Sequence, residues 1–202
     1  MERLIAGYRT FRANRWPSER ANYEQLAKGQ KPEYLVIACS DSRSDPATIF
    51  SARPGEMFVI RNVANIVPPF EEGGGYHGTS AALAFAVVVL KVKTVLVMGH
   101  AQCSGVAAML DGSHVENVPF VGQWTSLLAP AIARCGHAYD RQAAIERECV
   151  RLSLERLMTF PFVADRVRAG ALTLEGARFG IADGRLDVLD KATGAFAPIS
   201  DS

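Results

Sequence analysis

The chain has 202 residues, of which 49% are hydrophobic and 21% charged, and its 22 Lys and Arg nearly balance its 21 Asp and Glu. These figures are typical of a soluble globular protein and exclude the collagen-like, low-complexity and disordered classes. The formal net charge of +1 comes without an obvious basic stripe, which argues against a nucleic acid as the main partner. We expect a single domain over residues 1–202 with a full hydrophobic core.

The opening segment and the cysteine content indicate the compartment. Residues 1–16 mix charges among apolar positions, unlike a secretory signal. The longest apolar run, 79–90, is shorter than the ~20 residues that a membrane helix needs. Four cysteines in such a chain more often bind metal, take part in catalysis or lie buried than form disulfides. We therefore expect a cytoplasmic protein with no membrane contact.

The first half of the chain alternates predicted helices and strands. Helices are expected over 2–16 and 19–28, the first ending at Pro17 and the second at Gly29. Continuous apolar runs predict buried strands at 34–38, 57–60 and 94–98, and the run 79–90 predicts a buried helix before the last of them. Strands that are apolar on both faces and alternate with helices are typical of a parallel sheet.

The second half is predicted to be mainly helical. Helices are expected at about 103–110, 120–134, 140–158 and 161–168, with Glu146, Glu148 and Arg151 marking a solvated face. Strands at 178–182 and 186–189 flank Asp183-Gly184, which is a hairpin signal. The expected fold class is α/β: a mostly parallel central sheet flanked by helices, with an N-terminal helical arm and a C-terminal strand hairpin.

Potential metal ligands follow two of the predicted strands. Cys39 comes directly after the strand at 34–38, and His100 and Cys103 follow the strand at 94–98. Ligands in an open parallel sheet gather at the carboxyl ends of the strands, so these three side chains converge if the strands are neighbours. Two thiolates and one imidazole suit zinc, and three protein ligands leave a fourth position open, as in catalytic sites. The pattern therefore predicts a catalytic zinc site.

Two charged residues close to Cys39 could assist such a site. Asp41 lies two residues further on, returns to the same side of the chain and could accept a hydrogen bond from water on the metal. Arg43 could pair with Asp41, fix its orientation and keep it ionised. Alternatively, Asp41 could bind the zinc itself and close the site.

With these residues in place, the sequence resembles the β-class carbonic anhydrases. ACSDSR (38–43) and GHAQCSG (99–105) are similar to two signatures of that family. The segments 27–43, 53–69, 76–87 and 90–100 are similar to family segments at family spacing, and 157–186 resembles the closing helix and strand hairpin. The resemblance covers nearly the whole chain and implies a β-carbonic anhydrase-like fold.

The resemblance implies reversible hydration of carbon dioxide to bicarbonate and a proton. One zinc ion per chain would be held by Cys39, His100 and Cys103. Zinc lowers the pKa of bound water, and the hydroxide, oriented by Asp41 and Arg43, attacks the carbon of carbon dioxide. Because two thiolates donate more charge than imidazoles, we expect activity to be favoured on the alkaline side.

Similarity to the plant-type branch of the family implies a substrate pocket. Phe58, Val63 and Phe85 would form it, and Gln30 would donate a hydrogen bond to a substrate oxygen. In that branch these groups come from the neighbouring subunit, so the implied assembly is a homodimer or a tetramer with the arm, residues 1–30, packed on a partner. From the residues alone, the three apolar side chains could equally belong to an ordinary core.

The sequence departs from the family pattern at several positions. Ser44, Ala84 and Ser104 stand where an aliphatic residue, Glu or Gln, and Gly are usual. Val36 stands where another branch has the Trp of a regulatory bicarbonate site. Despite Arg61, we therefore expect no such regulation and an open metal site.

Two alternative functions remain open at this point. The departures leave room for a carbonyl sulfide or carbon disulfide hydrolase on the same fold, and Cys39 and Cys103 would also suit a non-catalytic zinc or thiol sensor. The remaining histidines, His77, His114 and His137, are expected to be loop or surface residues. Cys135 and Cys149 are expected to be small buried hydrophobes.

Overall fold

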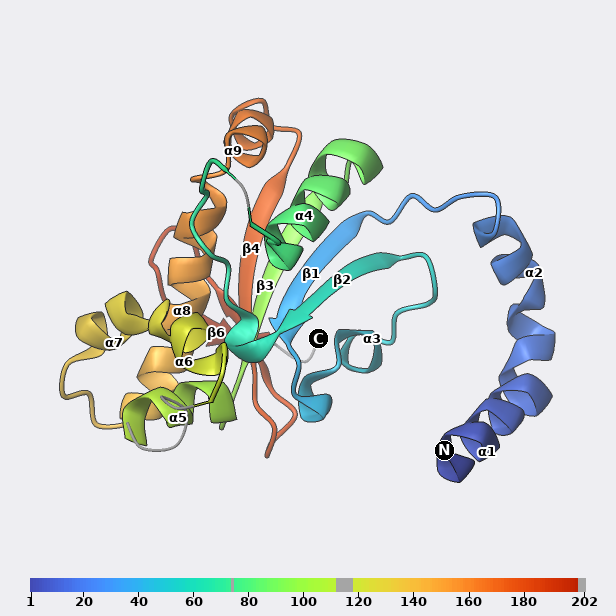
Figure 1. The fold of residues 1–202 in the computed structure, drawn as a ribbon, viewed down its shortest axis with the longest axis horizontal. Coiled ribbons are helices and arrows are strands. Elements are labelled where there is room, and N and C mark those ends of the chain that lie inside the picture. Colours follow the sequence, from blue (N-terminus) through green and yellow to red (C-terminus); the bar gives the residue numbers. More distant parts are fainter. Residues whose placement is uncertain (74, 112–117, 200–202) are drawn as a thin grey trace.

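The computed structural model describes residues 1–73, 75–111 and 118–199 and has a β-sheet at its centre (Figure 1). Within these residues the sheet has six strands in the order β2-β1-β3-β4-β5-β6. Strands β2, β1, β3 and β4 are parallel, whereas β5 and β6 each run antiparallel to the preceding strand. This confirms the mostly parallel α/β sheet. The strand bounds are Tyr34–Cys39 (β1), Met57–Asn62 (β2), Thr94–His100 (β3), Thr173–Phe179 (β4), Leu186–Leu189 (β5) and Phe196–Pro198 (β6).

Both faces of the central strand β1 are buried, as its apolar run predicts. Leu35 and Ile37 belong to the core on one face and Val36 and Ala38 to the core on the other, because successive side chains of a strand alternate. All four are at most 1% exposed, and burying a side chain the size of Val, Leu or Ile contributes about 1.5–3 kcal/mol. The core therefore anchors β1, whose last residue is Cys39.

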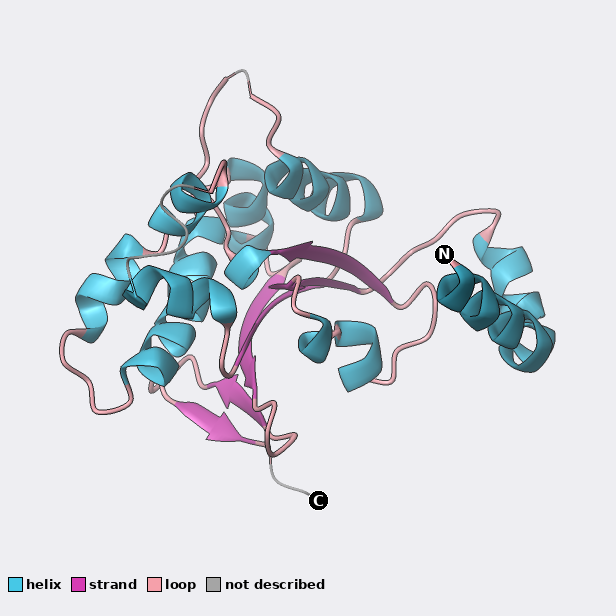
Figure 2. Ribbon diagram, turned by 60° about the horizontal axis from the view of Figure 1, so that its bottom comes forward, coloured by secondary structure: helices cyan, strands magenta, loops and turns pink. Residues whose placement is uncertain are grey.

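Helices lie on both faces of the sheet, most of them on one face (Figure 2). Those on the Leu35 face share a core with β1 and β3: α4 (Gly78–Ala84) with its π-helical continuation (Phe85–Leu90), α8 (Arg141–Leu157) and α9 (Pro161–Arg168). A second cluster joins α8 to α5 (Ser104–Asp111), α6 (Val121–Ser126) and α7 (Ala129–Cys135), and α3 (Pro46–Ile49) packs on the Val36 face. Within the described ranges no helix is both long and apolar enough to cross a membrane.

Two of the predicted helix boundaries are wrong, both at prolines. The chain stays helical past Pro17, through α1 (Glu2–Thr10), a π-helical segment (Phe11–Arg15) and α2 (Trp16–Leu26). Pro17 lies in the first turn of α2, where its missing N–H is not needed. Conversely, the helix expected at 120–134 is divided into α6 and α7, because Pro130 cannot donate a backbone hydrogen bond inside a continuous helix.

The hairpin around Asp183-Gly184 is confirmed, but its first strand is β4 (Thr173–Phe179) and not 178–182. The charged residue Glu175 and the glycine at 176 interrupt the apolar pattern of β4. The strand nevertheless pairs with β3 along its whole length. Gly184 has φ 69° in the turn, a conformation that glycine adopts at no steric cost. The short elements α3 and β6 were not predicted.

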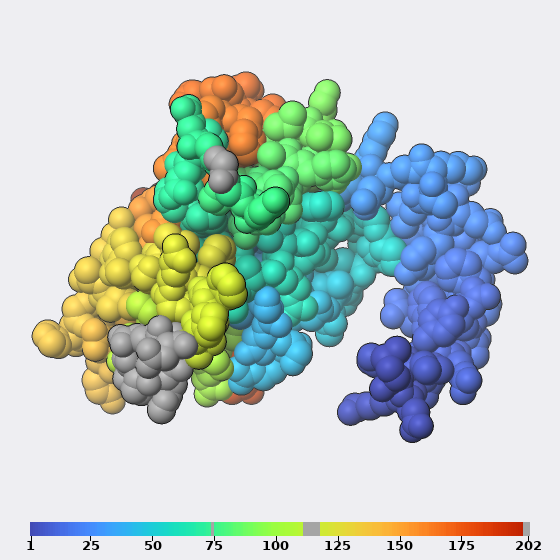
Figure 3. Space-filling view, viewed as in Figure 1, coloured from blue at the N-terminus to red at the C-terminus, as the bar shows by residue number. Residues whose placement is uncertain are grey.

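The N-terminal arm stands apart from the rest of the molecule (Figure 3). None of its residues from Glu2 to Leu26 is buried. It touches the body through a hydrogen bond from the Asn22 side chain to the Pro54 carbonyl and through Leu26 against Gly55. The arm therefore lacks, within the described chain, the tertiary packing from which most protein helices gain their stability.

Candidate metal centre

Three potential ligands meet at the carboxyl ends of two neighbouring strands. Cys39 is the last residue of β1 and His100 is the last of β3, and these strands are parallel neighbours. Cys103 directly precedes α5, after a tight turn in which Gln102 has φ 54°. The convergence predicted from the sequence is therefore confirmed.

The spacing of the ligand atoms fits a metal ion. The ligand atoms of these three buried residues all lie within 4.8 Å of one another. The Sγ atoms of Cys39 and Cys103 are 4.0 Å apart, and a tetrahedral zinc ion with Zn–S bonds of about 2.3 Å would hold two sulfurs about 3.8 Å apart. A disulfide would need about 2.0 Å, and both thiols are free.

His100 offers an unused nitrogen to this site. Its Nδ1 lies 2.9 Å from the carbonyl oxygen of Ala101, which can only accept, so Nδ1 carries the proton and donates it. Nε2 is then left with a lone pair, and it is buried with no hydrogen-bond partner among the described residues. A buried unpaired nitrogen is costly, and a metal ion would satisfy it.

The electrostatics of the site also favour a cation. The Cys103 thiol stabilises the neighbouring thiolate and lowers the pKa of Cys39 to about 4, with a smaller contribution from His100. That thiolate, together with burial, raises the pKa of Cys103 far above its usual range. Burial acts to lower the pKa of His100, but the neighbouring Cys39 sulfur and the Ala101 carbonyl together outweigh it and raise that pKa. A divalent cation would neutralise this negative charge and release the remaining protons.

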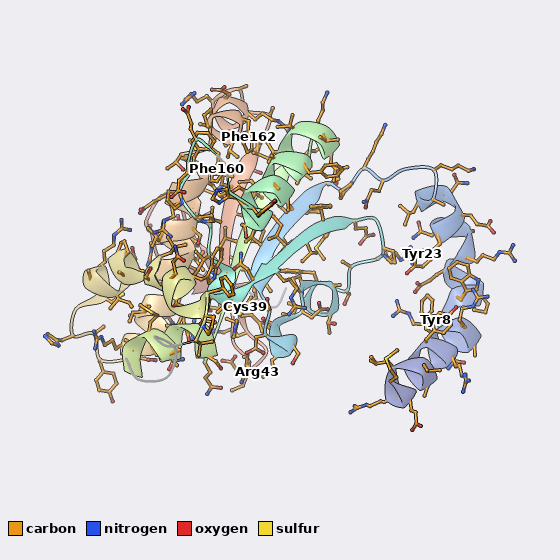
Figure 4. All side chains as sticks on the ribbon, in the orientation of Figure 1. Tyr8, Tyr23, Cys39, Arg43, Phe160 and Phe162 are labelled. Carbon is orange, nitrogen blue, oxygen red and sulfur yellow. The ribbon has the colours of Figure 1, made fainter. Side chains whose placement is uncertain are left out.

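Asp41 and Arg43 form a close ion pair beside the potential ligands; Figure 4 labels Arg43 and Cys39 in this region. Arg43 donates from Nε to Oδ1 (3.0 Å), from Nη2 to Oδ2 (2.7 Å) and from its backbone N–H to Oδ1 (2.9 Å). These bonds hold the pKa of the Asp41 carboxyl well below its usual range, so it stays ionised. Oδ2 lies 4.0 Å from Nε2 of His100, but Asp41 lies outside the cluster of mutually close ligand atoms.

Arg43 and Arg61 also fix the backbone around the ligands. Arg43 donates from Nη2 to the carbonyl oxygen of Gln102, which ties the two ligand-bearing loops together. Arg61 of β2 donates to the carbonyl oxygens of Cys39 (2.9 Å) and Asp41 (2.6 Å). The sequence predicted the Asp41–Arg43 pair from its spacing, whereas no local pattern indicated this role of Arg61.

The predicted departures Ser44, Ala84 and Ser104 occupy different surroundings. Ser44 is 1% exposed and donates its hydroxyl hydrogen bond to the carbonyl oxygen of Asp41. Ser104, the first residue of α5, is exposed directly after a ligand, and Ala84 is half-buried at the end of α4.

Of the predicted pocket residues, Val63 alone lies beside the metal centre of its own chain. It follows Asn62, which is paired with Cys39 in the sheet. Its carbonyl oxygen accepts a hydrogen bond from the indole of Trp124, and its side chain is 38% exposed.

The other predicted pocket residues lie toward the opposite end of β1. Phe58 is paired with Leu35, and its ring centroid is 5.9 Å from that of Phe85. Gln30 is exposed in the segment that precedes β1. A strand rises about 3.3 Å per residue, so the length of β1 separates Gln30 from Cys39 in the same chain.

Of the remaining histidines and cysteines that are described, all but Cys135 behave as predicted. His77 and His137 are exposed, and His114 lies outside the described residues. Cys149 is 1% exposed inside α8, and Cys135 is half-buried at the end of α7.

Glu146 contradicts the prediction of a solvated face. It is 2% exposed and forms an ion pair with Arg178 of β4, whose partner atoms are 2.7 Å away. Helical periodicity failed here because the countercharge lies on a strand distant in sequence. Glu148 and Arg151 are half-buried and paired with each other at the outer side of α8.

Comparisons with known proteins give one consistent relationship. A model of the carbonic anhydrase family matches residues 34–186. The chain is 34% identical to β carbonic anhydrase 3 of Arabidopsis thaliana, over 98% of this chain and 81% of that protein.

Solved structures agree with this. The structure of the β-carbonic anhydrase CcaA has 32% sequence identity and a TM-score of 0.88, covering 100% of this chain and 92% of its own. A structure from a study of two tetrameric β-carbonic anhydrases of Sordaria macrospora has 28% identity and a TM-score of 0.82, covering 97% and 98%.

Proposed function

This chain belongs to the β-carbonic anhydrases, and on that premise we propose that it binds one zinc ion and reversibly hydrates carbon dioxide to bicarbonate and a proton. Cys39, His100 and Cys103 would be the ligands. The observation that carries the proposal is the buried Nε2 of His100, which has no hydrogen-bond partner in the described part of the chain, beside two sulfurs 4.0 Å apart. Thiolate and imidazole donors suit zinc better than magnesium or calcium.

A zinc ion in such a site supplies a Lewis acid that makes water nucleophilic near neutral pH. Asp41, whose Oδ2 lies 4.0 Å from Nε2 of His100, would accept a hydrogen bond from a water molecule that reacts at this site and would thereby orient it. Arg43 keeps Asp41 ionised and turned in one direction, since the guanidinium reaches both carboxylate oxygens. Because both oxygens are engaged and Asp41 lies outside the ligand cluster, we place Asp41 beside the metal and leave the fourth position open.

A second copy of the chain would complete the substrate pocket. Gln30, Phe58 and Phe85 lie near the end of β1 that is remote from Cys39, so they are too distant to serve the site of their own chain. Phe85 is also 45% exposed. The arm also carries exposed apolar residues, including Leu4 (70%) and Tyr8 (61%), and exposed apolar surface of this kind marks an interaction site. We therefore propose that the arm packs on the partner and that the assembly is a dimer or a tetramer.

The proposal is tested by zinc stoichiometry together with stopped-flow hydration of carbon dioxide on the purified protein. One zinc ion per chain and a hydration rate that disappears after chelation and returns with zinc are expected. Zinc-loaded protein with no hydration activity would overturn the proposed reaction, and protein that takes up no zinc would overturn the ligand assignment.

Two additional measurements on the same protein separate the two alternatives. Turnover of carbonyl sulfide that exceeds turnover of carbon dioxide would identify a hydrolase on the same fold. A thiol sensor would need reactive sulfurs, but Cys39 and Cys103 are only 5% and 2% exposed. Thiol titration is therefore expected to find both protected in the zinc-loaded protein.

A further inference from the structure

A buried carboxylate contacts the backbone of a proposed zinc ligand. Oε1 of Glu146 accepts a hydrogen bond from the backbone N–H of Cys103 at 3.1 Å, in the protein interior. The same oxygen accepts a second hydrogen bond from the side-chain amide of Gln142, also at 3.1 Å. Glu146 thus reaches from the first half of α8 to the residue that directly precedes α5.

The other carboxylate oxygen is held from the sheet. Arg178 of β4 donates to Oε2 from Nε (3.0 Å) and from Nη2 (2.7 Å). Every oxygen of Glu146 is therefore engaged, and the side chain has one fixed position. Arg178 is paired in register with Gly99, next to His100. The ion pair therefore lies beside the segment 100–103 that carries two of the proposed ligands, which we call the ligand loop.

Two glycines allow α8 to approach closely enough for this contact. A Cβ at Gly99 would lie 2.9 Å from Val150, and a Cβ at Gly176 would lie 2.9 Å from the same side chain. Val150 is one turn after Glu146 on the face of α8 that packs on β3 and β4. Side chains at either glycine would push α8 away and draw Glu146 off Cys103.

The hydrogen bonds of the ligand loop come from three directions. The backbone N–H of Ala101 donates to the carbonyl of Phe179 in β4, and the carbonyl of Gln102 accepts from Arg43. Glu146 supplies the third contact, at Cys103. The loop needs such support because Gln102 has a left-handed backbone, which a non-glycine residue adopts at a cost.

Stability alone is a poor explanation for this pair. A buried ion pair must overcome the desolvation of both charges, and well-packed apolar residues often serve a fold equally well. What apolar residues cannot do is accept the Cys103 N–H, which would otherwise be buried without a partner. The pair therefore has a directional role in addition to its charge.

We propose that Glu146, braced by Arg178 and Gln142, is a positioning residue that sets the backbone of Cys103 so that its sulfur faces His100 and Cys39 before a metal ion binds. This inference rests on the proposed function, because it takes Cys103 as a zinc ligand. It is independent of which substrate the enzyme hydrates.

The experiment compares two charge-neutral double variants. Glu146→Gln/Arg178→Met keeps an oxygen that can accept the Cys103 N–H, whereas Glu146→Ala/Arg178→Met removes it, and neither leaves a buried charge unpaired. The readout is the rate of zinc release to a chelator. Glu148→Gln is the matched control, since Glu148 lies two residues further along α8 and is paired with Arg134 and Arg151 away from the loop.

We expect Glu146→Ala/Arg178→Met to release zinc at least ~10 times faster than the unchanged protein, the usual scale for lost partners of a metal ligand. The Gln variant and the Glu148→Gln control should stay within about threefold. Equal acceleration in both double variants, or unchanged release in both, would overturn the proposal, as would acceleration in the control.

A measurement on the unchanged protein decides the matter even where the double variants do not fold. Hydrogen exchange of the Cys103 amide should be slow in the zinc-free protein, comparable to amides in the middle of α8. Rapid exchange that becomes slow when zinc is added would overturn pre-positioning. Zinc uptake and carbon dioxide hydration by the unchanged protein report separately on the proposed function.

Discussion

Replacing Asp41 by Asn separates the proposed catalytic role of this side chain from its contribution to stability. The change preserves shape but places an amide where the Arg43 guanidinium now meets a carboxylate. The side chains of Asp41 and Arg43 are 16% and 43% exposed. An ion pair with this access to solvent contributes about 1 kcal/mol or less to the free energy of unfolding. Loss of an orienting partner in a metal site, by contrast, typically costs about 10- to 100-fold, equivalent to about 1.4–2.7 kcal/mol in the barrier.

Stopped-flow hydration, zinc content and thermal unfolding of Asp41→Asn together test this difference. We expect full zinc content, little change in Tm and a rate lowered by one to two orders of magnitude. Because Arg43 holds the pKa of Asp41 well below its usual range, Asp41 stays ionised throughout the assay range and its own titration should not shape the pH–rate profile of the unchanged protein. Asp165→Asn, which breaks an exposed ion pair with Arg168, is the matched control. Full activity in Asp41→Asn, or loss of its zinc, would refute the reasoning.

Four further outcomes are expected. Cys103→Ala should bind no zinc and unfold at a lower temperature than the zinc-loaded protein, as metal analysis and calorimetry would report. The hydration rate should rise between about pH 6.5 and about pH 9, since thiolate ligands acidify water weakly, and a flat profile would contradict this. Burial raises the pKa of Cys149 to about 12 from 9.0. The contribution of this neutral thiol to the free energy of unfolding is therefore complete below about pH 9 and is lost as the pH rises toward 12. Cys149→Ala should reduce this alkaline loss of unfolding free energy by up to about 4 kcal/mol. Deleting residues 1–26 should dissociate the assembly, which sedimentation would detect, and an unchanged mass per particle would show that the arm does not hold it together.

Much of the architecture could be predicted because it depends on neighbouring residues in the chain. The apolar runs of β1, β2 and β3 identified parallel strands, but the prediction that 57–60 is buried was wrong, because β2 is an edge strand of the described sheet and only Ile60 in it is buried. The boundary errors at Pro17 and Pro130 arose from positions where a proline can either begin or divide a helix. Strand β4 was harder, because Glu175 and Gly176 hide a strand whose pairing with β3 is visible only in the folded sheet.

The proposed ligands and Asp41 could be predicted from their positions at strand ends and from short spacings. Two residues along an extended chain return the side chain of Asp41 to the side of Cys39, and a turn of three residues brings His100 and Cys103 together. Those relations are local, so they are present in the amino-acid order itself. The surroundings of the site are not local. The helical pattern predicts that Glu146 is solvated. In the folded protein, Gly99 and Gly176 let α8 approach the sheet, and Arg178 of β4 supplies the countercharge that allows Glu146 to be buried. Burial depends on which surfaces meet, and a helix cannot encode which of its polar residues will find a partner on a distant strand.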